Sequence, residues 1–109
     1  MPDRLMADIL TETPADSHAL FTSVLERLTR RESLSAAQAE SAFGIIMDGA
    51  VSSERIAAFL MALRVRGETP AELLGAVTAL RQRMNAVPGL PSDTVDVCGT
   101  GGDNYGTLN

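Results

Sequence analysis

Residues 35–49, SAAQAESAFGIIMDG, carry a complete set of signals for one α-helix. Ser35 and Gln38 have the spacing of a capping box, in which each side chain accepts a hydrogen bond from a backbone N–H at the start of a helix. Behind the box, apolar residues recur at helical spacing and predict one apolar stripe: Ala39, Phe43, Ile46 and Met47. Gly49 follows, and glycine commonly ends helices. The stretch therefore predicts a short helix with one buried face.

Helical patterns continue on both sides of this stretch. Before it, from Ser17 to Arg31, the apolar residues again recur at helical spacing: Leu20, Val24, Leu25 and Leu28. After it, Ser52 or Ser53 can cap a helix that Gly67 ends. The apolar face of that helix is Ile56, Phe59, Leu60 and Leu63.

A fourth helix is predicted from Thr69 onward. Thr69 and Glu72 form a second capping box, and Pro70 occupies the first helical position, where its missing N–H costs nothing. The apolar residues that follow have spacings of four, three and four: Leu73, Val77, Leu80 and Met84. Residues 17–86 are thus expected to form a domain of four short helices joined by tight turns.

The composition changes after Ala86. Residues 87–94 contain two prolines and a glycine, which indicates a linker. Residues 95–98, VDVC, are typical of a short strand and run into a glycine-rich turn, as at the start of a βα unit. The fold class is therefore expected to be mainly α. A flexible or partly helical N-terminus (1–16) would precede the helical domain (17–86) and the linker (87–94), and residues 95–109 would be the first strand and phosphate loop of an α/β domain that is otherwise missing from this chain.

Charge and composition narrow the functional classes. The chain has 109 residues and a net charge of −5, and its basic residues are all arginines, scattered along it; this argues against a nucleic-acid-binding surface. No apolar run approaches the length of a membrane span and no signal-peptide pattern is present, so we expect a cytoplasmic protein. A single cysteine, Cys98, excludes an internal disulfide and is expected to be a buried filler at the strand end. His18 is expected to be solvated or to cap a helix.

The turn from Gly99 to Asp103, GTGGD, has the chemistry of an anion site. Its glycines permit positive φ angles and a close approach of the backbone to a ligand. Successive N–H groups can then converge on a phosphate, while Thr107 and Asn109 add polar side chains. Asp103 would repel a phosphate, so it would instead hold the loop or contact ribose hydroxyls. A glycine-rich hairpin or a flexible tail is the alternative interpretation.

Two common phosphate motifs do not fit this turn. The dinucleotide pattern Gly-x-Gly-x-x-Gly fails because Asn104 stands in place of the third glycine. The Walker pattern fails because Thr107, after Gly106, stands where a lysine is required, and the chain contains no lysine.

The stretch DVCGTGGD at residues 96–103, followed by TLN at 107–109, closely resembles the phosphoribosyl-diphosphate loop of the anthranilate phosphoribosyltransferase family. That family has Asp-x-x-Gly-Thr-Gly-Gly-Asp and then Thr-Phe-Asn-Ile-Ser-Thr. The helical part is similar to the small N-terminal α-domain of the family, through AVS at 50–52, AFLMALR at 58–64 and GET at 67–69. The resemblance covers nearly all of residues 17–109. Leu108 departs from the usual phenylalanine, and NYG replaces a glycine-rich triplet at 104–106.

The resemblance implies a set of ligand contacts. Gly99 would line the site shared by phosphoribosyl diphosphate and anthranilate, Gly102 and Asp103 would contact the phosphoribosyl donor, and Thr107 and Asn109 would hold its diphosphate. It also implies Mg²⁺ as cofactor, with ligands beyond Asn109 and none within this chain, and no catalytic residue here.

The resemblance further implies transfer of phosphoribosyl to anthranilate in tryptophan biosynthesis, and a homodimer formed through the helical domain. The 109-residue chain alone is expected to be inactive. Two alternatives stay open: a non-catalytic helical dimerisation module, and a relative of the pyrimidine nucleoside phosphorylases, whose corresponding loop carries an inserted valine that this chain lacks.

Overall fold

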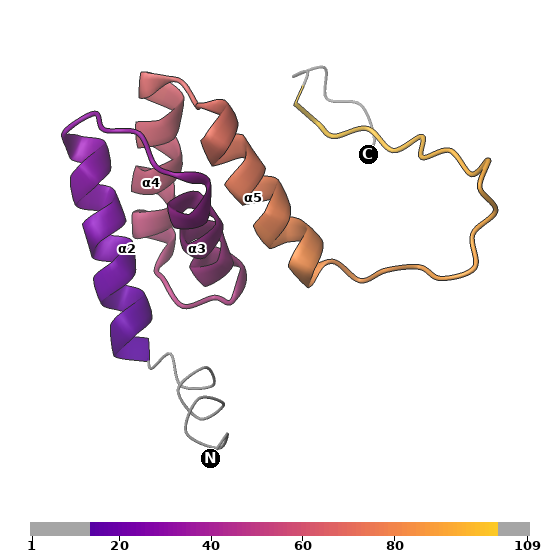
Figure 1. The fold of residues 1–109 in the computed structure, drawn as a ribbon, viewed down its shortest axis with the longest axis horizontal. Coiled ribbons are helices and arrows are strands. Elements are labelled where there is room, and N and C mark those ends of the chain that lie inside the picture. The colour runs from indigo at the N-terminus through magenta and orange to yellow at the C-terminus, as the bar shows by residue number, and fades with distance from the viewer. Residues whose placement is uncertain (1–13, 103–109) are drawn as a thin grey trace, which may run out of the picture.

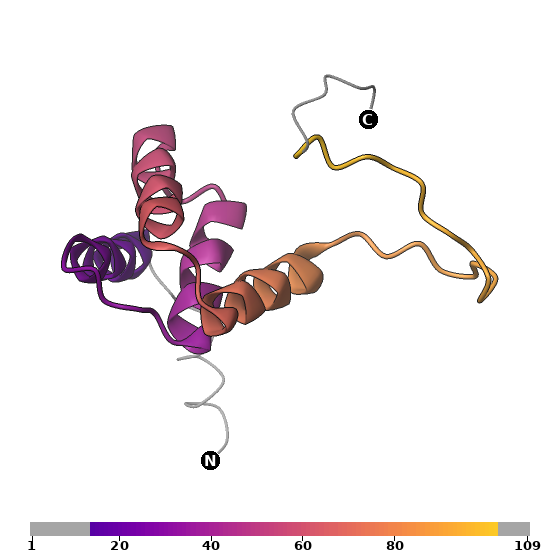
Figure 2. The same cartoon turned by 90° about the horizontal axis from the view of Figure 1, so that it is seen from above.

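A computed structural model describes residues 14–102 and contains four helices: α2 (Pro14–Thr29), α3 (Ala36–Met47), α4 (Ser53–Arg66) and α5 (Pro70–Arg83) (Figure 1). Both views place α2 and α5 on opposite sides of the bundle, with α3 and α4 between them (Figures 1 and 2). The predicted mainly helical fold is confirmed. None of the described helices has the length and apolar character needed to cross a membrane.

The helix boundaries follow the sequence signals closely. Both bonds of the Ser35–Gln38 capping box are present, at 2.9 and 3.1 Å, and so are both bonds of the Thr69–Glu72 box, at 2.9 and 3.3 Å. Ser52 is the N-cap of α4, but its side chain makes no capping hydrogen bond. The helices α3 and α4 end before glycines with positive φ, as predicted: Gly49 at 71° and Gly67 at 90°.

The first described helix differs from the prediction at its start. It begins at Pro14, three residues before the expected Ser17, so residues 14–16 of the segment expected to be flexible or partly helical belong to this helix. Proline is favoured in the first turn of a helix because its missing N–H has no partner there. Asp16 adds an acidic side chain in the same turn, where the helix dipole favours negative charge.

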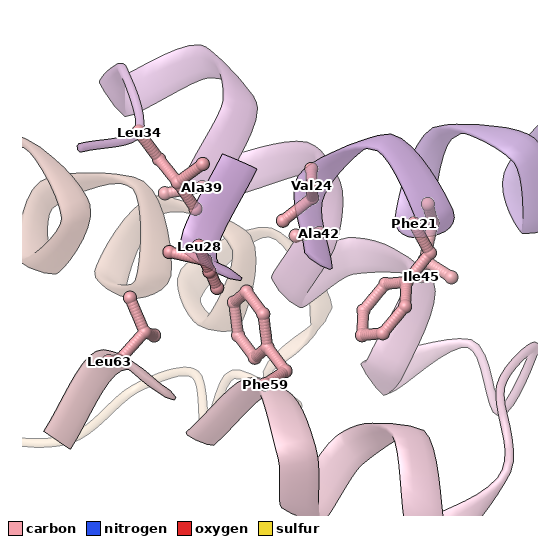
Figure 3. Close-up of a cluster of buried hydrophobic side chains, with 9 residues drawn as sticks. All are labelled: Phe21, Val24, Leu28, Leu34, Ala39, Ala42, Ile45, Phe59 and Leu63. Atoms are coloured by element: carbon pink, nitrogen blue, oxygen red, sulfur yellow. The ribbon is translucent and has the colours of Figure 1, made fainter. Parts of the chain in front are cut away.

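The core is formed mainly by α2, α3 and α4 (Figure 3). Phe21 and Phe59 are fully buried, with ring centroids 5.4 Å apart, and Phe43 meets Phe59 edge to face at 5.3 Å. Around these rings pack the other buried members of the cluster: Val24, Leu28, Leu34, Ala39, Ala42, Ile45 and Leu63. Three phenylalanines therefore supply the bulk of an otherwise aliphatic core.

The helix α5 packs on α3 through small residues. Gly75 lies so close to α3 that a Cβ there would stand 2.4 Å from the carbonyl oxygen of Ala36 and 2.7 Å from the Cβ of Ala39. Ala79 is fully buried one turn further along α5. This close approach of the two backbones requires glycine at position 75.

The apolar stripe of α5 is not part of the core. Leu73, Val77, Leu80 and Met84 are 55%, 50%, 47% and 58% exposed. Helical spacing identifies an apolar stripe but does not say which face packs on a neighbour. In α5, the face that packs on α3 is the small-residue face, which allows the closer approach.

Residues 84–102 leave the bundle as an extended segment (Figures 1 and 2). Residues 95–98 do not form a strand here; Val95 is 77% exposed and Val97 is 91% exposed. A strand is stabilised by hydrogen bonds to a neighbouring strand, and residues 14–102 provide none. The assignment of this segment to the first strand of an α/β domain stays a prediction.

Candidate phosphate-binding loop

The described part of the glycine-rich segment is exposed and stands apart from the helices (Figure 1). Its local order comes from Asp96, whose Oδ1 accepts a hydrogen bond of 2.8 Å from the backbone N–H of Cys98. This hydrogen bond lowers the pKa of Asp96 below its usual value. Further along, Gly101 has a φ of 74°, a left-handed conformation that glycine adopts without strain. The segment therefore makes a turn of the kind that can present backbone N–H groups.

Two of the five predicted ligand contacts lie in this segment. Gly99 and Gly102 are both exposed on the extended chain after α5. Among the described residues, an added Cβ at Gly102 would have only the hydroxyl of Thr100 within 4 Å, at 3.8 Å. Packing within residues 14–102 therefore does not require glycine at position 102, in contrast to Gly75. Asp103, Thr107 and Asn109 lie outside the described residues.

Two single residues can be compared with their predicted environments. Cys98 is exposed, so the prediction of a buried filler is wrong for this structure, because residues 14–102 contain no sheet against which the strand end could pack. His18 is exposed as expected, with its Nε2 3.4 Å from a guanidinium nitrogen of Arg55.

Sequence reasoning missed the full role of Glu72. Its Oε2 completes the predicted capping box, but its Oε1 also accepts a hydrogen bond of 2.8 Å from the backbone N–H of Leu34. Arg66 pairs with Oε2 and donates a 2.6 Å hydrogen bond to the carbonyl oxygen of Glu32. Glu72 is 2% exposed. Burial raises the pKa of Glu72, but the hydrogen bonds from Leu34, Thr69 and Arg66 outweigh it and hold the pKa below its usual value.

A polar cavity of about 230 Å³ lies near the end of α5 and is lined by α2, α3 and α5. Arg83 spans one side and forms a bidentate pair with Asp48, at 2.8 and 2.9 Å. Gln82 donates a 2.8 Å hydrogen bond to Glu40. Because these polar lining side chains are already paired with each other, they anchor the end of α5 on α3 and offer little to a ligand.

A metal centre cannot be built from the described residues. Within residues 14–102, no three His, Cys, Asp or Glu side chains group closely enough to hold a metal ion. The prediction had placed the Mg²⁺ ligands beyond Asn109, so it stays a prediction.

The helical bundle identifies the class of protein. The helical bundle domain of a glycosyl transferase family matches residues 22–84, which is more than half of the chain and includes the second half of α2 and all of α3, α4 and α5. The chain therefore belongs to this glycosyl transferase family.

Individual relatives carry a more specific name than the family. An anthranilate phosphoribosyltransferase of Gluconobacter oxydans is 49% identical over 89 residues, which are 82% of this chain and 24% of the relative. Those of Rhizobium rhizogenes and Beijerinckia indica are 51% and 48% identical, over 78% and 82% of this chain and 25% and 26% of their own lengths. The resemblance seen in the sequence is thus confirmed, and the chain spans about a quarter of the length of these relatives. No solved structure matches the chain.

Proposed function

We propose that this chain is the helical domain and donor loop of an anthranilate phosphoribosyltransferase, which transfers phosphoribosyl from phosphoribosyl diphosphate to the amine of anthranilate in tryptophan biosynthesis. The observation that carries the proposal is the coincidence of two features in one chain: a helical bundle about half identical to relatives of that name, and the GTGGD turn placed after it. A cytoplasmic location fits this role.

The loop would act on the leaving group. As the amine nitrogen attacks the anomeric carbon, the bond to diphosphate breaks and negative charge grows on the departing oxygens. Backbone N–H groups around Gly99 and Gly102, with the side chains of Thr107 and Asn109, would stabilise that charge by fixed dipoles. Asp103 would hold the turn or bind ribose hydroxyls, and Gly99 would also border the anthranilate. None of these groups needs to exchange a proton with the substrate.

The cofactor in this proposal is Mg²⁺. When bound to phosphoribosyl diphosphate it would neutralise phosphate charge, and its protein ligands would come from beyond Asn109.

The chain by itself is proposed to be inactive, and the full protein to be a homodimer formed through the helical domain. A loop without its sheet is not preorganised, so binding of the donor would lose free energy to ordering the chain. Calorimetry should find weak or no binding of phosphoribosyl diphosphate to the 109-residue chain. Turnover of anthranilate by that chain would contradict this part of the proposal.

The transferase assay follows the loss of anthranilate fluorescence on addition of phosphoribosyl diphosphate and Mg²⁺ to the full-length polypeptide. Gly102→Val should raise the KM for the donor by more than tenfold, because a side chain blocks close approach of the ligand to the backbone. Ser92→Val, on the exposed linker, is the matched control and should leave KM unchanged. Phosphorolysis of thymidine in place of anthranilate transfer would favour the nucleoside phosphorylase alternative.

A further inference from the structure

The last turn of α5 is held differently from the rest of the helix. Ala79 is the last buried residue of α5, and residues 80–83 are exposed. Beyond Ala79, the side chain of Arg83 reaches across to α3 and forms its bidentate pair with Asp48. The chain leaves the helix at the very next residue, because Met84 has extended backbone angles (φ −71°, ψ 146°). Arg83 therefore lies at the point where the bundle ends and the segment toward the donor loop begins.

Two residues of α3, Gly44 and Asp48, form a site for this guanidinium, which we call the Arg83 clamp. Gly44 is buried, and a Cβ added there would stand 2.9 Å from Nη2 of Arg83 and 3.3 Å from its Cζ. Asp48 is the C-cap of α3, where the helix dipole favours a cation. Hydrogen bonds from Arg83 lower the pKa of Asp48 below its usual value. A missing side chain, a carboxylate and a helix end thus combine to hold one guanidinium.

Stability alone does not account for the Arg83 clamp. The side chains of Arg83 and Asp48 are 32% and 58% exposed, and exposed ion pairs contribute little to folding because water and salt screen them. Glycine inside a helix also lowers stability relative to alanine, so Gly44 is unfavourable for α3 itself. What the clamp does fix is the place and direction in which α5 ends.

The segment after Arg83 can carry that direction toward the loop. Pro88 and Pro91 restrict the φ angles of the linker. The N–H of Thr94 donates a 3.1 Å hydrogen bond to the carbonyl oxygen of Pro91, which closes a turn. The linker is therefore stiffer than a chain of glycine and serine of the same length.

We propose that Arg83, held by Gly44 and Asp48, is a positioning residue that fixes where the polypeptide leaves the bundle toward the donor loop. It contacts neither substrate itself. Without the clamp, the last turn of α5 opens, and more of the chain must be ordered before the loop binds its ligand. This inference rests on the proposed function, because it assumes that the loop binds phosphoribosyl diphosphate.

Calorimetric titration of the full-length polypeptide with phosphoribosyl diphosphate tests the proposal. Arg83→Gln removes the charge and the bidentate pair, and it should raise the Kd for the donor about fivefold through the added cost of ordering the chain. Arg81→Gln is the matched control. Arg81 lies in the same last turn, is exposed, and makes no ion pair or hydrogen bond within residues 14–102, so its Kd should not change.

Gly44→Ala separates the position of α5 from the stability of the bundle. The added methyl group would displace the guanidinium of Arg83, whereas alanine favours the helix more than glycine does. We expect the Kd to rise as in Arg83→Gln while the urea unfolding midpoint does not fall. Combining the two substitutions should raise the Kd no further, because both remove the same interaction. A lower midpoint with an unchanged Kd would overturn the proposal, because the clamp would then be merely structural.

Amide hydrogen exchange of residues 80–84 in the full-length polypeptide gives a readout that needs no donor. These amides should exchange about tenfold faster in Arg83→Gln and Gly44→Ala than in the natural protein, and at an unchanged rate in Arg81→Gln. Unchanged exchange, or an unchanged Kd in Arg83→Gln, would overturn the proposal. A natural full-length protein that binds no donor would contradict the proposed function as well. The two failures are distinguishable, because failure of the inference alone leaves donor binding by the natural protein intact.

Discussion

The bundle of α2 to α5 and the segment from Val95 to Gly102 differ in where their structure comes from. The helices are held by bonds and contacts made within about 70 residues, such as the two capping boxes and the buried phenylalanines. Within the described residues, the segment is held by short-range hydrogen bonds from Cys98 to Asp96, and its valines are exposed. Helices satisfy their own backbone groups, whereas a strand needs a neighbour. The comparison teaches that the bundle is held by contacts among the described residues, whereas the segment has only local hydrogen bonds there.

The largest loss of stability should follow from a substitution at Gly75 that disrupts the packing of α5 on α3. Gly75→Val should destabilise it by more than about 3 kcal/mol, because its Cβ would overlap the backbone oxygen of Ala36 and force α5 away from α3. Ala71→Val, at an exposed position of α5, is the control and should cost roughly 0.5 kcal/mol through helix propensity. Urea unfolding followed by circular dichroism measures both, and equal midpoints would contradict the packing argument.

A smaller but still large loss of stability is expected from a substitution at Glu72. Glu72→Gln should cost about 3 kcal/mol, because it leaves the guanidinium of Arg66, whose side chain is 12% exposed, without its ionic partner. Glu54→Gln, in the first turn of α4, changes an exposed carboxylate and should shift stability far less. The same unfolding experiment decides this, and similar losses for the two variants would mean that the buried pair has no special role.

The pH dependence of the unfolding midpoint should also reflect the Glu72 carboxylate. The pKa of Glu72 is lower in the folded state than its usual value of 4.5, so the unfolded chain binds a proton first as the pH falls. The stability that Glu72 contributes is therefore complete above pH 4.5 and is lost as the pH drops from there through the folded-state pKa. Unfolding midpoints measured from pH 6 to pH 3 should fall more steeply for the natural chain than for Glu72→Gln. Parallel curves would show that the bonds to Leu34, Thr69 and Arg66 do not stabilise the charged form.

Much of the bundle could be predicted because its signals are local. The helix ends are marked by hydrogen bonds and φ angles that involve only a few neighbouring residues, at Ser35, Thr69, Gly49 and Gly67. Packing partners are not local, so the sequence did not reveal that α5 meets α3 through Gly75 and leaves its stripe exposed.

Sequence reasoning falls short at Glu72 and at the candidate phosphate-binding loop for the same reason, because both depend on partners that are distant in the sequence. The second hydrogen bond of Glu72 goes to Leu34, on the loop between α2 and α3, which no spacing rule predicts. At the candidate loop, the GTGGD pattern points to a phosphate through the chemistry of glycine N–H groups. The geometry that would make it a site depends on a neighbouring sheet, which these residues do not supply.

The smallest change in unfolding free energy should come from a substitution in the segment from Val95 to Gly102. This prediction is the sharpest test of the difference between the segment and the bundle. Val97 is 91% exposed, so Val97→Asp should change the unfolding free energy of the 109-residue chain by less than about 0.5 kcal/mol. In the full-length protein, the predicted strand would lie in a parallel sheet covered by helices, where an aspartate is strongly unfavourable. The same substitution should then lower the unfolding midpoint and the transferase activity together. Thr94→Asp, on the linker, should be silent in both proteins. A large loss in the short chain would show that the segment packs on the bundle, and silence in the long one would show that the strand never forms.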